Sequence, residues 1–353
     1  MDSPKPIPST IREWIIRKKP ANEKVTKEHF SLRTVSLNDQ QVEALIVSQR
    51  YISNDPAQRT WMDDGPFNDR PYLPPVMQEG VKVFAGTVAE VIETYGTTGF
   101  TAGEMVFGYF GWADYALVDP NAGAPIEKIP PTIKPEEFHC LSLSGRSAYF
   151  AFFRRAEATK SMRTVVVNAA AGAVGSMVTQ FAKNIIGIER VIGICGSNEK
   201  CRIIKEKCGV DIALNYKSPN FEPEFIAATP DYIDLLFDNV GGKQLDLGIK
   251  RIAPMGKVLS CGAVSHYERD EVSAVSGSSW MQIIYQQATI LGFLVVNYLA
   301  ETPEAVRDMS KWAQEGKIEL LRSVYEASLE EVPDAYRFML EGKGVGKLIT
   351  KLK

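Results

Sequence analysis

The hydrophobic and polar positions along the chain follow two different patterns, and the change between them lies near residue 135. Before it, short alternating runs within 28–47 predict half-buried strands. Between 55 and 111, Pro and Gly are dense between short apolar segments, which is typical of strands joined by tight turns. The first part of the chain is therefore predicted to form a β-rich, barrel-like unit.

After residue 135, apolar runs alternate with helical patterns. The strand-like runs are 164–170, 190–196, 233–240, 256–263 and 288–296. Because these runs are apolar on both faces, they predict a parallel sheet that is covered by helices on both sides. Two further amphipathic helices follow from about Thr302, and the chain ends on a strand-like segment, 347–353, that we expect to return to the β-rich unit.

The predicted fold class is α/β, with two domains in 353 residues. The β-rich domain occupies 1–140, the domain with the parallel sheet occupies 141–310, and residues 311–353 return to the first domain. Net charge is −3, from 40 Lys and Arg against 43 Asp and Glu, and this balance gives no general attraction to nucleic acid or to anionic membranes.

The cysteines and apolar segments favour a cytoplasmic protein. Five cysteines form no CxxC pair, which argues against a disulfide framework and for a reducing compartment. The apolar run 288–299 is too short to span a bilayer, and the N-terminal segment has prolines and charges where a signal peptide needs an apolar stretch. We expect no membrane and no nucleic-acid partner.

The clearest chemical motif is the strand–turn–helix at 164–180. Its pattern is AxGxxG, with Ala170 where the usual dinucleotide fingerprint has its first glycine. Gly172 would allow the backbone to approach a pyrophosphate, and Gly175 would allow the helix to pack closely on the strand. The first helical N–H groups would face the phosphates, so the predicted contact residues are Ala171, Gly172, Ala173, Val174 and Gly175.

The next strand indicates which dinucleotide binds. An NAD site places a carboxylate at the end of this strand, but here the strand ends in Gly196, followed by Ser197. This leaves room for a 2′-phosphate, to which Lys200 can supply charge and Tyr216 a hydroxyl, and we expect NADP(H). In the alternative interpretation, Lys200 is a solvated surface lysine.

Several blocks together resemble one known family. They are YISNDPAQR (51–59), AAAGAVGS (169–176), VIGICGSNEK (191–200), ALNYK (213–217), FDNVGG (237–242), SCGAVSHY (260–267) and GVGKLIT (344–350). In this order they resemble the zinc-independent medium-chain dehydrogenase/reductases, in the branch of prostaglandin/leukotriene reductases and alkenal/enone double-bond reductases. The resemblance implies a split, GroES-like catalytic barrel, a doubly wound Rossmann NADP-binding domain between its halves, and NADPH-driven reduction of a C=C bond conjugated to a carbonyl.

The resemblance also implies site residues. Tyr267 matches a tyrosine placed near the nicotinamide ribose and the carbonyl, and Tyr51 opens a block that lines the pocket. Further cofactor contacts are implied for Asn239, Gly241, Cys261, Phe293, Leu294, Val295 and Gly344. Tyr267 could instead only cover the cofactor edge, the DNVGG segment could be a simple turn, and most of 293–295 could be sheet core.

The chain departs from the family pattern in two places. Ala57 and Gln58 replace a Tyr-Met pair, which leaves the substrate preference open, and Gly344 stands where an asparagine is usual. The aromatic residues Trp61, Tyr72, Phe110 and Trp112 could wall an apolar pocket or belong to the core.

A metal site is not expected. The alcohol-dehydrogenase relatives hold zinc with Cys and His ligands, but this chain has only His29, His139 and His266, and no second pair completes a tetrahedral site beside His139 and Cys140. Without a Lewis acid, conjugate reduction is favoured over ketone reduction, because its charge spreads over an enolate.

The predicted function is therefore NADPH-dependent reduction of an α,β-unsaturated ketone or aldehyde by a 2-alkenal/enone double-bond reductase. Hydride goes to the β-carbon, and Tyr267 and the cofactor ribose hold the enolate oxygen. The alternatives are an NADPH quinone oxidoreductase and a non-catalytic NADPH-binding protein. The expected partners are a small enone or enal and a second copy in a homodimer, for which an exposed strand at 292–296 would be suited.

Overall fold

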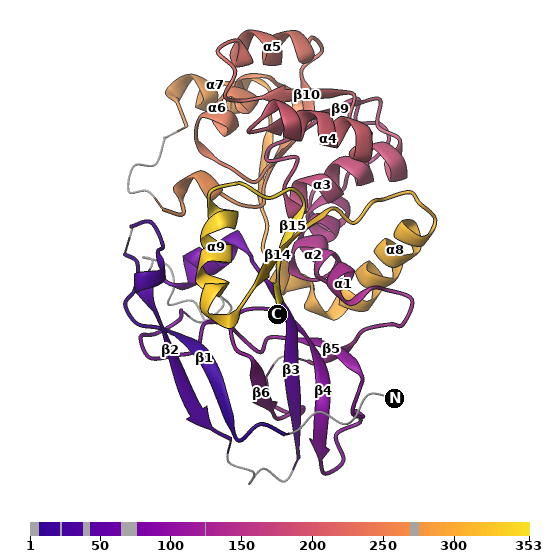
Figure 1. Ribbon diagram of the computed structural model, residues 1–353. Coiled ribbons are helices and arrows are strands. Elements are labelled where there is room, and N and C mark those ends of the chain that lie inside the picture. The colour runs from indigo at the N-terminus through magenta and orange to yellow at the C-terminus, as the bar shows by residue number, and fades with distance from the viewer. Residues whose placement is uncertain (1–6, 22, 38–42, 65–75, 124, 269–274) are drawn as a thin grey trace. The chain divides into compact units, whose positions relative to one another are not determined.

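The computed structural model describes residues 7–21, 23–37, 43–64, 76–123, 125–268 and 275–353, and the chain divides into two compact units (Figure 1). Unit 1 comprises Met1–His139, Ser323–Lys343 and Leu348–Lys353, and unit 2 comprises Cys140–Arg322 and Gly344–Lys347. The chain leaves unit 2 at 322/323, later than the predicted change at 310/311, because all of helix α8 (Thr302–Gln314) belongs to unit 2.

Unit 2 is built on a parallel sheet in the order β10-β9-β8-β11-β12-β13, in which all neighbouring strands are parallel. The strands are β8 (Thr164–Val167), β9 (Arg190–Cys195), β10 (Ile212–Asn215), β11 (Ile233–Asp238), β12 (Ile252–Ser260) and β13 (Thr289–Gly292). The first strand lies in the middle, and the order reverses between β8 and β11. This is the doubly wound Rossmann arrangement, so the predicted fold class is confirmed.

The helices of unit 2 precede, connect or follow these strands along the chain. They are α2 (Leu143–Tyr149), α3 (Ala173–Gln180), α4 (Asn198–Cys208), α5 (Phe221–Ala228), α6 (Gly242–Lys250), α7 (Gly277–Tyr285) and α8, while α1 (Pro135–Leu141) spans the change of unit. Two π-helical turns, η3 (Phe150–Arg155) and η4 (Phe181–Ile186), extend α2 and α3. The core between sheet and helices is apolar and includes Val166, Ile192, Phe225, Leu236, Ile249 and Val258.

Unit 1 is an antiparallel β structure. Its main sheet has the order β14-β15-β3-β4-β5-β7, with β6 paired to β3, and a separate ribbon joins β1 to β2. The strands are β1 (Thr10–Ile16), β2 (Phe30–Ser36), β3 (Ala44–Ser53), β4 (Thr87–Tyr95), β5 (Met105–Gly108), β6 (Tyr115–Val118), β7 (Glu127–Lys128), β14 (Arg322–Ala327) and β15 (Lys347–Leu352). Since Thr350 on β15 pairs with Ile52 on β3, the last strand returns to the β-rich part of the chain as predicted.

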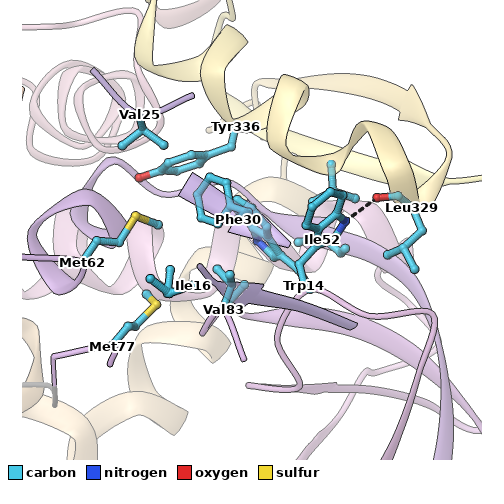
Figure 2. Packing of buried hydrophobic residues seen from close by; sticks show 13 residues of the cluster. Trp14, Ile16, Val25, Phe30, Ile52, Met62, Met77, Val83, Leu329 and Tyr336 are labelled. Atoms are coloured by element: carbon cyan, nitrogen blue, oxygen red, sulfur yellow. Dashed lines mark hydrogen bonds between the residues drawn. The ribbon is translucent and has the colours of Figure 1, made fainter. Parts of the chain in front are cut away.

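The C-terminal segment is built into the core of unit 1 (Figure 2). Tyr336, on α9 (Val332–Leu340), packs on Trp112 with ring centroids 5.5 Å apart, and Trp112 also packs on Phe30 at 5.0 Å. The indole Nε1 of Trp14 donates a hydrogen bond of 2.7 Å to the carbonyl of Leu329. Trp112 is fully buried in this core, so of the two alternatives, pocket wall and core, the structure bears out the core. Phe110 is 4% exposed and belongs to a second apolar cluster.

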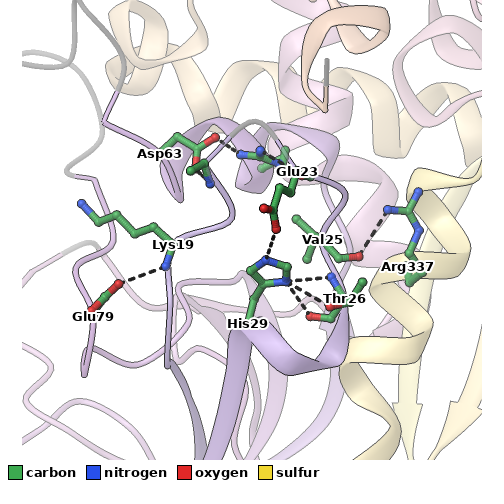
Figure 3. A network of polar contacts seen from close by, with 10 residues as sticks. Lys19, Glu23, Val25, Thr26, His29, Asp63, Glu79 and Arg337 are labelled. Atoms are coloured by element: carbon green, nitrogen blue, oxygen red, sulfur yellow. Dashed lines mark hydrogen bonds and ion pairs between the residues drawn. The ribbon is translucent and has the colours of Figure 1, made fainter. Parts of the chain in front are cut away.

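A polar network ties the loop before β2 to its neighbours in unit 1 (Figure 3). His29 is buried, its Nδ1 accepts a hydrogen bond from the Thr26 N–H at 3.0 Å, and its Nε2 lies 3.8 Å from a Glu23 carboxylate oxygen. Arg59 is fully buried, pairs with Asp63 and donates to the Glu23 carbonyl at 3.3 Å. These contacts give His29 a structural role.

Candidate functional site

The turn after β8 forms a backbone cradle. A Cβ on Gly175 would lie 2.3 Å from the Ala169 carbonyl oxygen and 2.8 Å from the Ala170 Cα, so only glycine allows α3 to pack this closely on the strand. A Cβ on Gly172, the N-cap of α3, would lie 3.2 Å from the same oxygen. Because Gly172 offers no capping side chain, the first N–H groups of α3 can bind an anion.

Ala170 takes the place of the first fingerprint glycine, and β9 accommodates it. Gly193 on β9 faces Ala170, and a Cβ at Gly193 would come within 2.9 Å of the Ala170 Cβ. The Ala170 N–H donates to the Ile194 carbonyl at 2.9 Å. The methyl group of Ala170 therefore occupies space that Gly193 leaves free, and the turn keeps its shape.

Two lysines and a tyrosine gather at the end of β9. Ser197, the N-cap of α4, accepts a hydrogen bond from the Lys200 N–H at 3.2 Å, and the Tyr216 ring lies where a Cβ on Gly196 would meet it at 3.2 Å. Lys217 Nζ lies 5.7 Å from the centroid of the Tyr216 ring. Burial lowers the pKa of Lys200, and the like charge of Lys217 lowers it further. A phosphate dianion between these cations would relieve that repulsion.

Lys217 was not among the predicted site residues. From the sequence alone, Lys217 is interpreted as a solvated surface lysine. Its proximity to Lys200 depends on the pairing of β10 with β9, which the sequence does not show. Asn215 on β10 pairs with Cys195 on β9, and this register sets the residues after each strand beside one another. The hydrogen bond of 2.9 Å from Asn215 Nδ2 to Asn198 Oδ1 holds the two ends together.

A buried carboxylate organises the turn after β11. Asp238 is fully buried and accepts hydrogen bonds from Asn168 Nδ2 at 2.6 Å, the Gly241 N–H at 2.9 Å and the Val240 N–H at 3.1 Å. Burial raises the pKa of Asp238, and these three donors oppose the rise. Asn239 Nδ2 donates to the Asn168 carbonyl at 2.9 Å. The DNVGG segment is therefore joined to the turn after β8.

The loop after β12 carries the predicted tyrosine. The Cys261 and Gly262 N–H groups donate to the Asp238 carbonyl at 2.8 and 3.3 Å, so this loop is held by the turn after β11. The Tyr267 hydroxyl accepts a hydrogen bond from the Ala263 N–H at 3.3 Å. Burial raises the pKa of Tyr267, which keeps its hydroxyl protonated and able to donate. Burial also raises the pKa of the Cys261 thiol to about 12, so this thiol is protonated at neutral pH.

Two more predicted segments belong to unit 2. Phe293 follows β13, and its N–H donates to the Ser260 carbonyl at the end of β12 at 3.2 Å. Leu294 is half-buried and Val295 is buried. Gly346, a residue that the sequence did not single out, bridges to Gly172, with its N–H 2.8 Å from the Ala171 carbonyl oxygen. Gly344 lies two residues before it in the same segment.

Unit 1 holds the other predicted residues. Tyr51 is half-buried on β3, opposite Val88 and Lys351. Gln58 is fully buried and caps its own turn: its Oε1 accepts from the Asp55 N–H at 2.8 Å, and its Nε2 donates to the Phe84 carbonyl at 2.8 Å. Both polar atoms of the Gln58 amide are therefore used by the fold.

A half-exposed aromatic cluster lies in the same unit. Phe84 stacks on Tyr109 with centroids 4.8 Å apart, and Trp61 packs edge-on against Phe84 at 5.6 Å. Of the aromatic residues predicted as pocket walls, Trp61 therefore keeps an accessible position, whereas Tyr72 lies outside the described residues.

In unit 2 the predicted cofactor residues other than Gly344 lie at one edge of the parallel sheet. They follow the carboxyl ends of six strands: Ala171–Gly175 after β8, Gly196–Lys200 after β9, Tyr216 after β10, Asn239 and Gly241 after β11, Cys261 and Tyr267 after β12, and Phe293–Val295 after β13. In open α/β sheets, ligands bind at this end, where the strand order reverses. The backbone cradle and the lysine pair fit the pyrophosphate and 2′-phosphate of NADP(H).

Comparisons with known proteins give the family. The family described as "Zinc-binding dehydrogenase" matches residues 173–314, and the one described as "N-terminal domain of oxidoreductase" matches residues 12–126. Prostaglandin reductase 1 of Rattus norvegicus is 33% identical over 333 residues, which cover 92% of this chain and 94% of the relative. The chain belongs to the zinc-independent medium-chain dehydrogenase/reductases, in the prostaglandin reductase branch.

Other members of this reductase family are similar over nearly the whole chain. The NADPH-dependent curcumin reductase of Escherichia coli is 30% identical over 351 residues, which cover 97% of this chain and 96% of the relative. The crystal structure of CurA from Vibrio vulnificus in complex with NADPH has a TM-score of 0.85 at 29% identity and covers 97% of this chain and 99% of that chain. The family predicted from the motifs is confirmed.

Across the described ranges, no group of three or more His, Cys, Asp or Glu side chains is arranged to hold a metal ion. Metal independence stays a prediction. In the same part of the chain, no helix has both the length and the apolar character to cross a membrane.

Proposed function

We propose that the chain is an NADPH-dependent reductase of the C=C bond in α,β-unsaturated ketones and aldehydes. The observation that carries this proposal is that the lysine pair, the glycine cradle and the protonated Tyr267 hydroxyl all follow carboxyl ends of one parallel sheet. The relatives named prostaglandin reductase and NADPH-dependent curcumin reductase support it.

The cofactor would lie along the carboxyl ends of the strands in unit 2. The first N–H groups of α3 would bind the pyrophosphate, and Lys200, Lys217 and Tyr216 would bind the 2′-phosphate. Asn239, Gly241 and the segment 293–295 would hold the nicotinamide end. Bound NADPH supplies a hydride that the β-carbon of the substrate accepts.

The chain's own contribution is to stabilise the enolate. Tyr267 donates a hydrogen bond to the carbonyl oxygen, where negative charge develops in the transition state. The Ala263 N–H bonded to the Tyr267 oxygen fixes the hydroxyl and makes it a better donor, because hydrogen bonds in series strengthen one another. The α-carbon then receives a proton from Tyr267 or from water.

A substrate screen tests the proposal. Purified protein is given NADPH or NADH with aliphatic enones and enals of graded chain length, and oxidation of the cofactor is followed together with the products. We expect saturated carbonyl products, preference for NADPH, and rates that rise with chain length, since each buried methylene contributes about 0.8 kcal/mol. Turnover of quinones without enones would favour the quinone reductase, and no cofactor oxidation with any acceptor would favour the non-catalytic alternative.

We also propose that the chain forms a homodimer through β13. This strand is last in the order of the sheet, and Ile290 on it is 45% exposed. The neighbouring helix α7 exposes large apolar side chains: Trp280, Met281, Ile284 and Tyr285. An open strand edge beside such a surface favours pairing with a second copy. The proposed compartment is the cytoplasm, since all five cysteines are free thiols.

A further inference from the structure

Three aromatic rings stack in unit 2 and end at the predicted nicotinamide segment. Tyr298, on the 3-10 helix η6 (Val295–Glu301), stacks on Phe150 with centroids 5.3 Å apart and planes 12° apart. Its other neighbour is Phe293, at 5.5 Å and 25°. Phe150 is fully buried, whereas Tyr298 and Phe293 are half-buried. Tyr298 therefore connects the core to Phe293.

The π-helical turn that carries Phe150 makes a second contact with the same segment. Arg155, at the end of η3, donates from Nε to the Gly292 carbonyl at 2.9 Å. Because a π-helix is closed by hydrogen bonds between residues five apart, Phe150 and Arg155 lie about one turn from each other and reach the segment together. Gly292 and Phe293 are thus held from η3, through one hydrogen bond and one ring stack.

From these contacts we propose that Tyr298 is a positioning residue for NADPH. Its ring, held on Phe150, fixes Phe293 and thereby the segment 293–295 in the conformation that contacts the nicotinamide end. This inference rests on the proposed function. We assign the effect to the ring rather than to the hydroxyl, because the ring makes both contacts, with Phe150 and with Phe293.

Loss of the ring stack should affect the two ends of the cofactor differently. Lys200 and Lys217 follow β9 and β10, while Phe293 follows β13 at the opposite end of the strand order. Loss of the stack should therefore weaken binding of the nicotinamide end and leave binding of the adenosine end intact. A general loss of structure would weaken both.

The test compares two probes on purified full-length protein. Dissociation constants are measured for NADPH and for adenosine 2′,5′-bisphosphate, which carries the 2′-phosphate but no nicotinamide. Tyr298→Leu should raise the Kd for NADPH by about tenfold, the equivalent of a lost aromatic pair, and leave the Kd for the bisphosphate unchanged. Tyr298→Phe, which keeps the ring, should behave as wild type for both probes. Lys200→Ala is the matched control and should weaken both.

Two outcomes would overturn the inference. One is an unchanged Kd for NADPH in Tyr298→Leu, and the other is an equal loss for both probes. If Tyr298→Leu does not fold, Tyr298→Met, which also removes the ring but keeps more of its volume, must show the same selective loss. A wild-type protein that binds both probes but reduces no enone would contradict the proposed function alone, and the comparison of the probes would still decide the role of Tyr298.

Discussion

Lys200 is the residue on which the cofactor preference depends. Its side chain shares the end of β9 with Lys217, and both can face a 2′-phosphate that NADH lacks. Lys200→Ala should raise the Kd of NADPH by about 10- to 100-fold, the equivalent of a charged hydrogen bond worth about 1.5–3 kcal/mol, and should hardly change that of NADH. Fluorescence titration with both cofactors measures this. Equal effects on NADPH and NADH would contradict the assignment.

The lowered pKa of Lys200 predicts a pH dependence of cofactor binding. In the free protein, burial and Lys217 disfavour the ammonium form, so the proton is lost at a lower pH than the ordinary 10.5. Below that folded-state pKa the buried charge costs stability, and this cost diminishes as the pH rises from the folded-state pKa to 10.5, the ordinary value of the unfolded chain. Since the phosphate needs the charged form, NADPH affinity should fall in this alkaline range. Lys200→Arg stays charged and should bind with no such fall; a parallel fall in both proteins would contradict the prediction.

The Tyr267 hydroxyl is the group that we propose to stabilise the enolate, and its removal tests this role. Tyr267→Phe should lower kcat by about 100-fold and change KM little, because the hydroxyl acts on charge that is present mainly in the transition state. Steady-state kinetics with an enone that saturates the enzyme separates the two constants. An unchanged kcat would mean that another donor, such as the cofactor ribose, holds the enolate.

At the scale of elements, the two glycines around the start of α3 have separable roles. Gly175→Ala would force a methyl group to within 2.3 Å of a backbone oxygen, so it should destabilise the protein by about 1–3 kcal/mol. Gly172→Ala meets only one atom, at 3.2 Å, and should keep its stability while binding NADPH more weakly. Denaturant unfolding and cofactor titration of both variants measure this. Equal losses of stability would contradict the division of roles.

The elements that the sequence predicts are those with unbroken patterns. The apolar strands β8, β9, β11 and β12, and the helices after β8, β9 and β11, are found as predicted. Helix α5 was missed because it is short and has Pro223 in its first turn, and α7 because it begins in a Ser- and Gly-rich stretch that is typical of a turn. In strand β1 the charged residue Glu13 is buried, and Arg33 and Lys82 form ion pairs with it. The alternation of apolar and polar residues that would indicate this strand is therefore interrupted in the sequence.

In the candidate site, too, the sequence predicts local features but not the contacts between distant segments. The motif residues after β8 and β9 follow from the sequence, because glycine spacing and strand ends are local features. Lys217, Gly346 and the stack on Tyr298 are contacts between segments that are distant in the chain, and they depend on strand pairing. The burial of Gln58 could not be predicted either, because a polar side chain is normally expected at the surface. It is fully buried here because the fold supplies hydrogen-bond partners for both of its amide atoms.

At the scale of the whole molecule, the proposed dimer predicts a change of mass. Wild-type protein at micromolar concentration should sediment as two copies, and Ile290→Lys should sediment as one, because it places a charge on the open edge of β13. Ile226→Lys is the matched control, since Ile226 is 44% exposed on α5, which packs beside β10 at the other end of the strand order. A wild-type monomer, or an Ile290→Lys dimer, would contradict the proposal.

The central claim is that the chain reduces the C=C bond and leaves the carbonyl intact. The most direct measurement uses NADPH with deuterium at the transferable position of the nicotinamide, together with a medium-chain enone, and locates the label in the product by NMR. We expect a saturated ketone with deuterium on the former β-carbon. An allylic alcohol with deuterium on the carbinol carbon would contradict it.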